Sequence, residues 1–168
     1  SRKALTEKGK EEAIRIIETT ELKNDRVLVV YLPDCHESLA GIIAGRIREK
    51  YHRPAFVLTG GETSAKGSGR SIESYSMYEE LVKCADLMIQ FGGHPMAAGL
   101  SIEEKNIEEF RRRLNVNCTL TDEELRPKIV IDVPMPVSYI TKELVEQISL
   151  LEPFGKGNTK PVFAQKNL

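Results

Sequence analysis

The chain has 168 residues, of which 40% are hydrophobic and 29% are charged, as is typical of a soluble globular protein. No apolar run approaches the roughly 20 residues that a membrane-spanning helix needs, so we expect no membrane partner. The formal net charge is −1, which excludes a global positive field for nucleic acid and restricts any polyanion site to a local patch.

The first sixty residues predict a helix followed by a strand–helix–strand unit. The spacing of apolar side chains predicts an amphipathic helix over residues 3–20. Residues 27–32 and 55–59 are continuous apolar runs, typical of buried strands. Ser38 is a candidate N-cap for a helix between them. This order predicts a βαβ unit, and therefore a parallel strand pair with a right-handed crossover.

The following residues predict loops, helices and one short strand. Residues 60–71 are polar and rich in glycine, which predicts a loop or hairpin. Helices are expected around residues 75–83, 85–91 and 103–114, and a short strand at 99–102.

The composition changes at about residue 115, where a polar, turn-rich stretch begins. Residues 128–133 predict a strand, and residues 161–164 look like the start of another. Between them Thr141 is the expected N-cap of a helix.

The stretch from Phe91 to Gly99 is one candidate ligand site. It contains Gly92, Gly93 and His94, followed by small residues. Glycine lets the backbone approach a ligand closely, and histidine supplies a donor that can become cationic near neutral pH. Such a loop can hold a phosphate or a sugar against backbone N–H groups. The alternative is a tight turn with a surface histidine.

A second candidate lies at residues 66–71. Lys66 and Arg70 can contact phosphate oxygens, and an arginine can do so with two parallel N–H donors. Ser68 adds a hydroxyl group. The spacing is that of neither a P-loop nor a GxGxxG dinucleotide motif. The alternative is a flexible, solvated hairpin.

A third candidate is His36, which follows the first predicted strand. Ligands of open α/β sheets collect outside the carboxyl ends of strands, so His36 could face the same cleft. The alternative is a helix-capping loop. Asp34, His36 and Ser38 are a Ser/His/Asp set in name, but they lack a nucleophile elbow, which argues against a hydrolase triad.

Metal and thiol chemistry find little support in the sequence. The three cysteines are far apart without a CxxC pair, which argues against disulfides or structural zinc and favours a reducing, cytoplasmic setting. Nuclease chemistry usually needs metal-bound carboxylates and histidines, and the sequence has no such cluster. The residues alone indicate an α/β domain that binds an anionic ligand.

The same motifs occur in this order in a known family. His36 with residues 41–47, then residues 66–71, then residues 92–99 resemble the DHHA1 domain, the C-terminal half of the DHH phosphoesterase core. Residues 151–158 resemble the segment that leads into the OB-fold of RecJ-type single-stranded-DNA-specific exonucleases.

The resemblance implies a role within a metal-dependent 5′→3′ exonuclease of bacterial DNA repair and recombination, located in the cytoplasm. It implies that Mn²⁺ or Mg²⁺ is held by a DHH domain outside this chain, and that this chain holds no metal and no catalytic residue. It also implies that single-stranded DNA and the DHH domain are the partners. The implied substrate-binding residues are His94, Gly93, Gly92, Arg70, Ser68, Lys66 and His36.

For the fold, the resemblance implies an α/β domain with a mixed, mostly parallel sheet flanked by helices, and a truncated appendage leading into an OB-fold. Residues 1–22 would form a linker helix from the DHH domain, residues 23–115 the DHHA1 domain, and residues 116–168 the incomplete start of the OB-fold region.

Other functions remain open at this point. The chain could be a free-standing module that binds a nucleotide or a phosphorylated ligand, or an interaction domain without a ligand. It could also be the DHHA1 part of an oligoribonuclease or of a cyclic-dinucleotide phosphodiesterase.

Overall fold

The structure, a computed structural model, describes residues 1–166. The internal contacts divide the chain into two units, Ser1–Pro127 and Lys128–Leu168, and each is described by itself. Within the described residues, no helix combines the length and the apolar character needed to cross a membrane.

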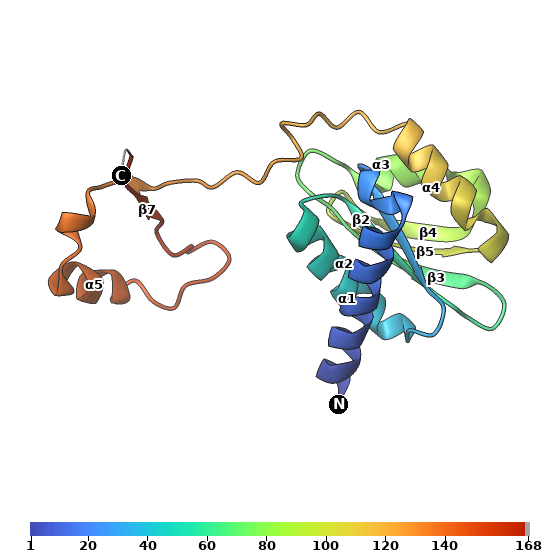
Figure 1. Ribbon diagram of the computed structural model, residues 1–168, viewed down its shortest axis with the longest axis horizontal. Coiled ribbons are helices and arrows are strands. Elements are labelled where there is room, and N and C mark those ends of the chain that lie inside the picture. Colours follow the sequence, from blue (N-terminus) through green and yellow to red (C-terminus); the bar gives the residue numbers. More distant parts are fainter. Residues whose placement is uncertain (167–168) are drawn as a thin grey trace. The chain divides into compact units, whose positions relative to one another are not determined.

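The first unit is built on a five-stranded sheet with the order β1-β2-β3-β5-β4 (Figure 1). The strands are β1 (Leu28–Leu32), β2 (Ala55–Thr59), β3 (Ala65–Arg70), β4 (Met88–His94) and β5 (Ala97–Ile102). The predicted βαβ unit is confirmed, because β1 and β2 are parallel and α2 (Glu37–Tyr51) connects them.

The mixed α/β class is confirmed, but parallel pairing is not in the majority. In this five-stranded sheet β1 and β2 pair in parallel, whereas β2–β3, β3–β5 and β4–β5 are antiparallel. The physical reason is the length of the connections. Residues 60–64 join β2 to β3 and residues 95–96 join β4 to β5, and such short links permit hairpins but no crossovers.

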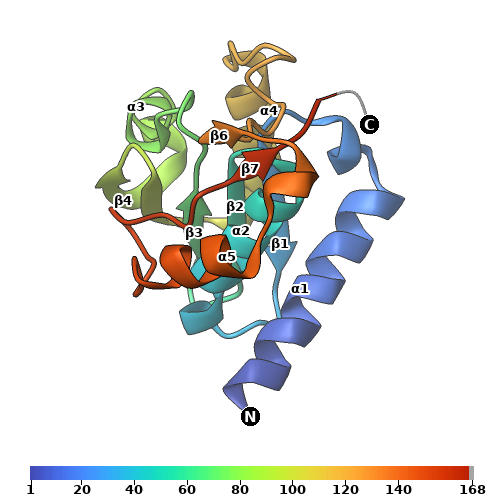
Figure 2. The ribbon, with the colours of Figure 1, turned by 90° about the vertical axis from the view of Figure 1, so that its left-hand side faces the viewer.

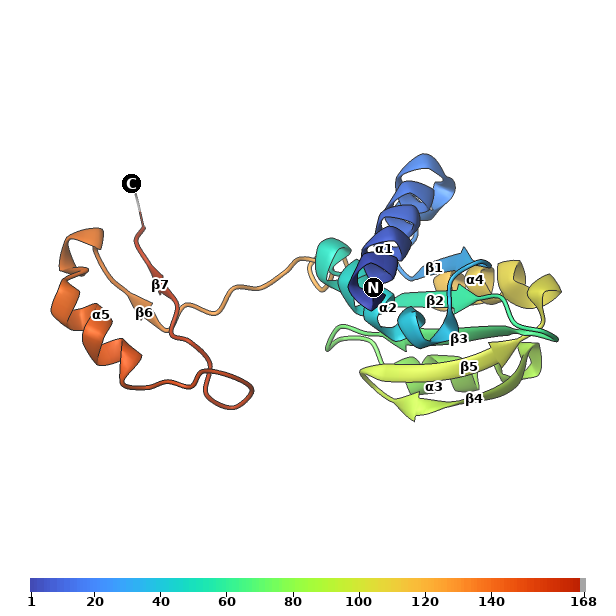
Figure 3. The same ribbon diagram turned by 90° about the horizontal axis from the view of Figure 1, so that it is seen from below.

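Helices cover both faces of the sheet (Figure 3). On one face, α1 (Arg2–Thr19) packs against β1, and α2 packs against β2 and β3, with Ile17 and Ile43 in the buried cluster. On the other face, α3 (Met77–Val82) and α4 (Ile107–Val116) form the second cluster. Along the sheet, α1 lies near β1 and α3 near β4 (Figure 2).

Two expectations in the middle of the chain are wrong. Residues 65–70 are a central strand instead of a loop, and residues 88–94 are an edge strand instead of the end of a helix and the start of a loop. In β3 the glycines meet a packing requirement, since a Cβ atom on Gly69 would lie 2.5 Å from Met77 Sδ. In β4, pairing with β5 outweighs the helical spacing of the apolar residues.

The start of α2 also differs from the prediction. The N-cap is His36 and not Ser38, which lies in the first turn. The Nδ1 atom of His36 accepts a hydrogen bond from the backbone N–H of Ser38 at 3.2 Å and lies 2.9 Å from its Oγ. An imidazole nitrogen therefore does the capping that we expected from a hydroxyl group.

The second unit contains α5 (Lys142–Ser149) and a parallel pair of two-residue strands, β6 (Val133–Pro134) and β7 (Phe163–Ala164) (Figure 1, orange to red). The predicted cap is confirmed, because Thr141 Oγ1 accepts from the N–H of Leu144 at 3.2 Å. The strand expected at 128–133 is largely absent from the described residues, where residues 129–131 are exposed. Short 3-10 helices lie at Glu21–Asn24, Ala85–Leu87, Glu104–Asn106 and Val137–Tyr139.

Candidate functional site

Strand alternation brings most of the predicted site residues onto one face of the sheet. Side chains two apart on a strand point to the same face, so Lys66, Ser68 and Arg70 of β3 lie together. The strand register extends this face across β5 to β4, where it includes Gly92 and His94. We call this surface the polar face, defined by Lys66, Ser68, Arg70, Gly92, His94, Ala97, Gly99 and Ser101.

The polar face is open to solvent over β4 and β5. The neighbouring helix α2 packs on β2 and β3, and Gly92, His94 and Gly99 are exposed. A Cβ atom on Gly92 would meet nothing within 4 Å, and one on Gly99 would meet only the Gly67 carbonyl oxygen at 3.8 Å. The missing side chains leave a flat surface that another backbone can approach closely.

Gly93 has a different role from Gly92. Its backbone φ of +152° is a conformation that residues with a side chain rarely adopt. A Cβ atom there would lie 2.4 Å from the carbonyl oxygen of Ala97 and 2.6 Å from Ala98 Cα. The structure therefore explains Gly93 by the geometry of the β4–β5 hairpin, which places His94 at the end of β4.

The cations of the polar face are not neutralised by carboxylates. Lys66 Nζ donates to Ser101 Oγ at 2.9 Å, and Arg70 Nη1 donates to the carbonyl oxygen of Gly69 at 2.8 Å. Within residues 1–166, neither side chain forms a salt bridge. By contrast, Arg111, Arg112 and Arg113 of α4 each form salt bridges, at 2.6, 2.7 and 2.6 Å to Asp25, Glu109 and Asp86. The polar face thus offers two cations without a salt-bridge partner among residues 1–166, although the whole chain is close to neutral.

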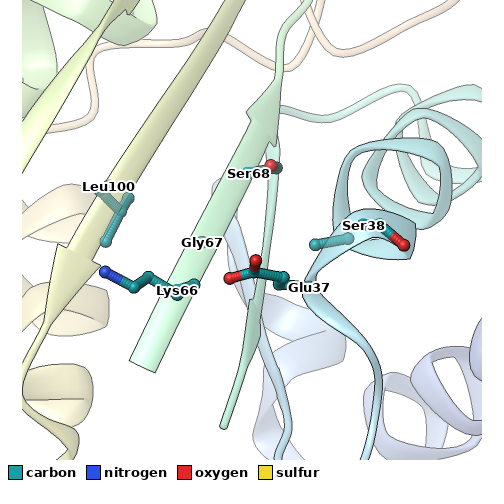
Figure 4. Close-up of a pocket in the computed structure, with 7 residues that line it drawn as sticks. Glu37, Ser38, Lys66, Gly67, Ser68 and Leu100 are labelled. Atoms are coloured by element: carbon teal, nitrogen blue, oxygen red, sulfur yellow. The ribbon is translucent and has the colours of Figure 1, made fainter. Parts of the chain in front are cut away.

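A surface cavity of about 300 Å³ lies between the start of α2 and β3 (Figure 4). Glu37 and Ser38 line it from the helix, and Lys66 and Ser68 from the strand. The Glu37 carboxylate points from α2 toward β3, whereas the Lys66 side chain extends toward β5 (Figure 4). The cavity is therefore mixed in charge, with cationic and hydroxyl groups on the strand side.

His36 lies apart from the sheet residues. It lines a second cavity of about 720 Å³, formed by residues 33–37, residues 60–64 and Lys66. Its Nδ1 is engaged in capping α2, which leaves Nε2 for any ligand. The two cavities share Glu37 and Lys66, and this is the connection between His36 and the other predicted site residues.

Sequence reasoning missed Ser101 and Glu37. Ser101 is nearly buried and holds the ammonium group of Lys66. The alternation of residues 97–102 could have revealed it, because Gly99 and Ser101 then share one face of a strand. Glu37 had no comparable signal, because only the packing of α2 on β3 places it beside Lys66.

The chemistry of the site fits an anion and does not fit a divalent metal. Within residues 1–166, no group of three or more His, Cys, Asp or Glu residues could hold a metal ion. Burial raises the pKa of the thiols of Cys35, Cys84 and Cys118, so none of them is an activated thiolate near neutral pH. The polar face is suited to binding an anion such as a phosphate group.

Comparisons with known proteins agree with this architecture. Residues 24–119 match the DHHA1 domain, and residues 131–168 match the RecJ OB domain. A single-stranded-DNA-specific exonuclease RecJ from Bacillus subtilis is 36% identical over 164 residues, which cover 95% of this chain and 21% of that protein. The RecJ of Escherichia coli is 34% identical over 173 residues, which cover 97% of this chain and 30% of that protein.

A solved structure shares the fold. The crystal structure of RecJ in complex with Mg²⁺ from Thermus thermophilus superposes with a TM-score of 0.82 at 28% identity, over 96% of this chain and 25% of that one. The chain thus spans less than a third of the length of these relatives. The match over residues 24–119 covers more than half of the chain, which therefore belongs to the DHHA1 domain family, in the form that RecJ proteins combine with an OB domain.

Proposed function

We propose that this chain is the substrate-binding part of a RecJ-type single-stranded-DNA exonuclease. In this proposal the polar face grips the sugar–phosphate backbone, opposite a DHH domain supplied by the rest of the protein. The observation that carries the proposal is the pair Lys66 and Arg70, which lie on a face lined with glycine and form no salt bridge within residues 1–166. The relatives named as single-stranded-DNA-specific exonucleases support the choice of substrate.

The residues of the polar face have distinct tasks in this proposal. Lys66, Arg70 and His94 contact phosphate oxygens, and Ser68 donates its hydroxyl group to the same backbone. Gly92 and Gly99 leave room for the strand to lie close to the sheet, where backbone groups add further contacts. His36 is the weakest member, since one of its nitrogens is used in capping.

The hydrolytic chemistry belongs elsewhere in the intact protein. A divalent metal, when bound, supplies an activated water and stabilises the charge that develops at the phosphate. RecJ from Thermus thermophilus has been solved in complex with Mg²⁺ and with Mn²⁺, and we propose that the DHH domain holds such ions here. The described residues of this chain do not fit them. Their task is to hold the strand so that the scissile phosphate stays in place.

The proposal also includes a domain organisation and a cellular role. Residues 1–22 act as the linker from the DHH domain, residues 23–115 as the DHHA1 domain and residues 116–168 as the start of the OB-fold region. The enzyme digests in the 5′→3′ direction during DNA repair and recombination in the bacterial cytoplasm.

A reconstitution experiment tests the proposal. This chain is mixed with a separately produced DHH half, and digestion of labelled single-stranded DNA is measured with Mn²⁺ or Mg²⁺. Digestion is expected only when both parts and the metal are present. Digestion by this chain alone would contradict the assignment of the metal site to the DHH domain.

A binding experiment tests the polar face directly. In the intact protein, with EDTA to prevent digestion, Arg70→Ala should weaken single-strand binding roughly tenfold or more, because a charge-assisted hydrogen bond is lost. The slope of log K against log salt should fall in magnitude by roughly 0.7 for one phosphate contact. Arg112→Ala is the matched control, since this exposed arginine is paired with Glu109 on α4. Equal effects of the two variants would contradict the assignment.

A further inference from the structure

The helix α2 carries two glycines at positions where glycine is unfavourable. Gly41 and Gly45 lie inside the helix Glu37–Tyr51, and glycine is among the poorest helix formers. The two are four residues apart, so they lie on the same face of the helix. Such a pair is typical of a place where another group must approach the helix backbone closely.

The group that approaches is the side chain of Arg70. A Cβ atom on Gly41 would lie 2.7 Å from Arg70 Nη2 and 3.4 Å from its Cζ, so the guanidinium group lies directly against Gly41. A Cβ atom on Gly45 would lie 4.0 Å from Arg70 Cγ, so the aliphatic part passes beside Gly45. The Arg70 side chain therefore runs along α2 toward the N-terminal end of the helix.

This direction brings the guanidinium group toward the other cation of β3. The N-terminal end of α2 lines the 300 Å³ cavity together with Lys66 and Ser68. Arg70 Nη1 is fixed by the carbonyl oxygen of Gly69 at 2.8 Å, and within residues 1–166 the guanidinium group forms no salt bridge. Its Nη2 side is the side turned to Gly41.

We infer that Gly41 is a positioning residue for Arg70, which it seats against α2 so that the guanidinium group meets the substrate phosphate beside Ser68. This inference rests on the proposed function and adds a residue outside the polar face to it. Outside the helix's own backbone, the three atoms nearest to a methyl group at position 41 all belong to the end of the flexible Arg70 side chain. The substitution therefore moves the guanidinium group and leaves the helix in place.

The test compares two glycines of the same helix face. Single-strand binding is measured by fluorescence anisotropy with the intact protein in EDTA over a series of salt concentrations. Gly41→Ala should weaken binding at least about threefold, which is half of the Arg70→Ala loss on a logarithmic scale. The slope of log K against log salt should fall in magnitude by up to roughly 0.7. Gly45→Ala is the matched control, because its new methyl group makes only an ordinary contact at 4.0 Å. Unchanged binding in Gly41→Ala, or an equal loss in Gly45→Ala, would overturn the inference.

A double-mutant cycle separates positioning from a general effect on the fold. If Gly41 acts through Arg70, adding Gly41→Ala to Arg70→Ala should change neither the affinity nor the salt slope further. An additional loss of the same size in the double variant would overturn the inference. If Arg70→Ala itself left binding unchanged, the proposed function of the polar face would fail. If only Gly41→Ala left it unchanged, this inference alone would fail.

Discussion

Replacing Gly69 by alanine tests how the central strand β3 is packed. Gly69 points to the face opposite the polar face, toward the cluster that contains Met77 and Phe56. The new methyl carbon would lie 2.5 Å from Met77 Sδ, 2.7 Å from Phe56 Cε1 and 2.8 Å from Phe56 Cδ1. Both neighbours are completely buried, so they cannot move aside into solvent.

The size of the effect follows from two opposing terms. Overpacking a buried site costs about 1–3 kcal/mol, because side chains leave their preferred rotamers. Alanine is favoured over glycine in a strand by roughly 0.5–1 kcal/mol. Gly99→Ala is the matched control, because it makes the same change in the adjacent strand β5 with only one atom, at 3.8 Å, near the new methyl group. The preference for alanine cancels between the two variants, so Gly69→Ala should be less stable than Gly99→Ala by about 1–3 kcal/mol.

Urea unfolding followed by far-ultraviolet circular dichroism measures this difference. With a typical dependence on urea of about 1–3 kcal/mol per molar, the two midpoints should differ by roughly 1 M. The Gly69→Ala variant should unfold first. Equal midpoints would refute the reasoning, since they would mean that the glycine-bearing side of β3 does not face Met77 and Phe56.

Three further predictions concern the first unit. Phe110→Ala removes a fully buried ring that packs edge-to-face on a neighbouring phenylalanine at 5.4 Å, and should lower the free energy of unfolding by about 3–5 kcal/mol in urea titrations; a loss below about 1 kcal/mol would contradict this packing. Gly93→Ala should destabilise the β4–β5 hairpin and speed hydrogen exchange of its amides, because φ is +152°, whereas Gly92→Ala should not; similar exchange in both variants would argue against the hairpin geometry. Hydrogen bonds from Arg112 and a second arginine lower the pKa of Glu109 to about 2 in the folded protein. The charged Glu109 carboxylate therefore stabilises the fold fully above its ordinary pKa of 4.5, and this stabilisation is lost as the pH falls through the pKa of the folded state. The difference in urea midpoint between Glu109→Gln and the parent should therefore narrow from pH 5 toward pH 2, and a constant difference would refute the charge effect.

Local patterns were sufficient for much of the fold. The strands at 28–32 and 55–59 are apolar runs, and both are buried as the runs predict. The helices α1 and α2 follow the apolar spacing, and α5 follows its capping signal at Thr141. In these elements the local preference and the tertiary packing favour the same structure, which is the condition under which a pattern in sequence is reliable.

The elements β3 and β4 were missed because their local signals are weak. β3 alternates polar residues with glycine and alanine, a pattern that resembles a loop until the partners on both sides are known. The spacing of apolar residues before Gly92 predicts a helix, but residues 88–94 form the strand β4 because they pair with β5. Strand formation depends on pairing partners, and one partner of β3, the strand β5, is distant in the chain, so no local window around β3 contains it.

For the candidate site too, the sequence indicates the residue types and the tertiary structure decides their arrangement. The sequence predicts the residue types, because glycine, lysine, arginine, serine and histidine in two short motifs indicate a ligand with phosphate groups. Their arrangement depends on strand register, since a shift of one residue would turn Lys66, Ser68 and Arg70 into the core. The contact of Arg70 with Gly41 likewise exists only because α2 packs on β3, which brings together residues that are 29 positions apart.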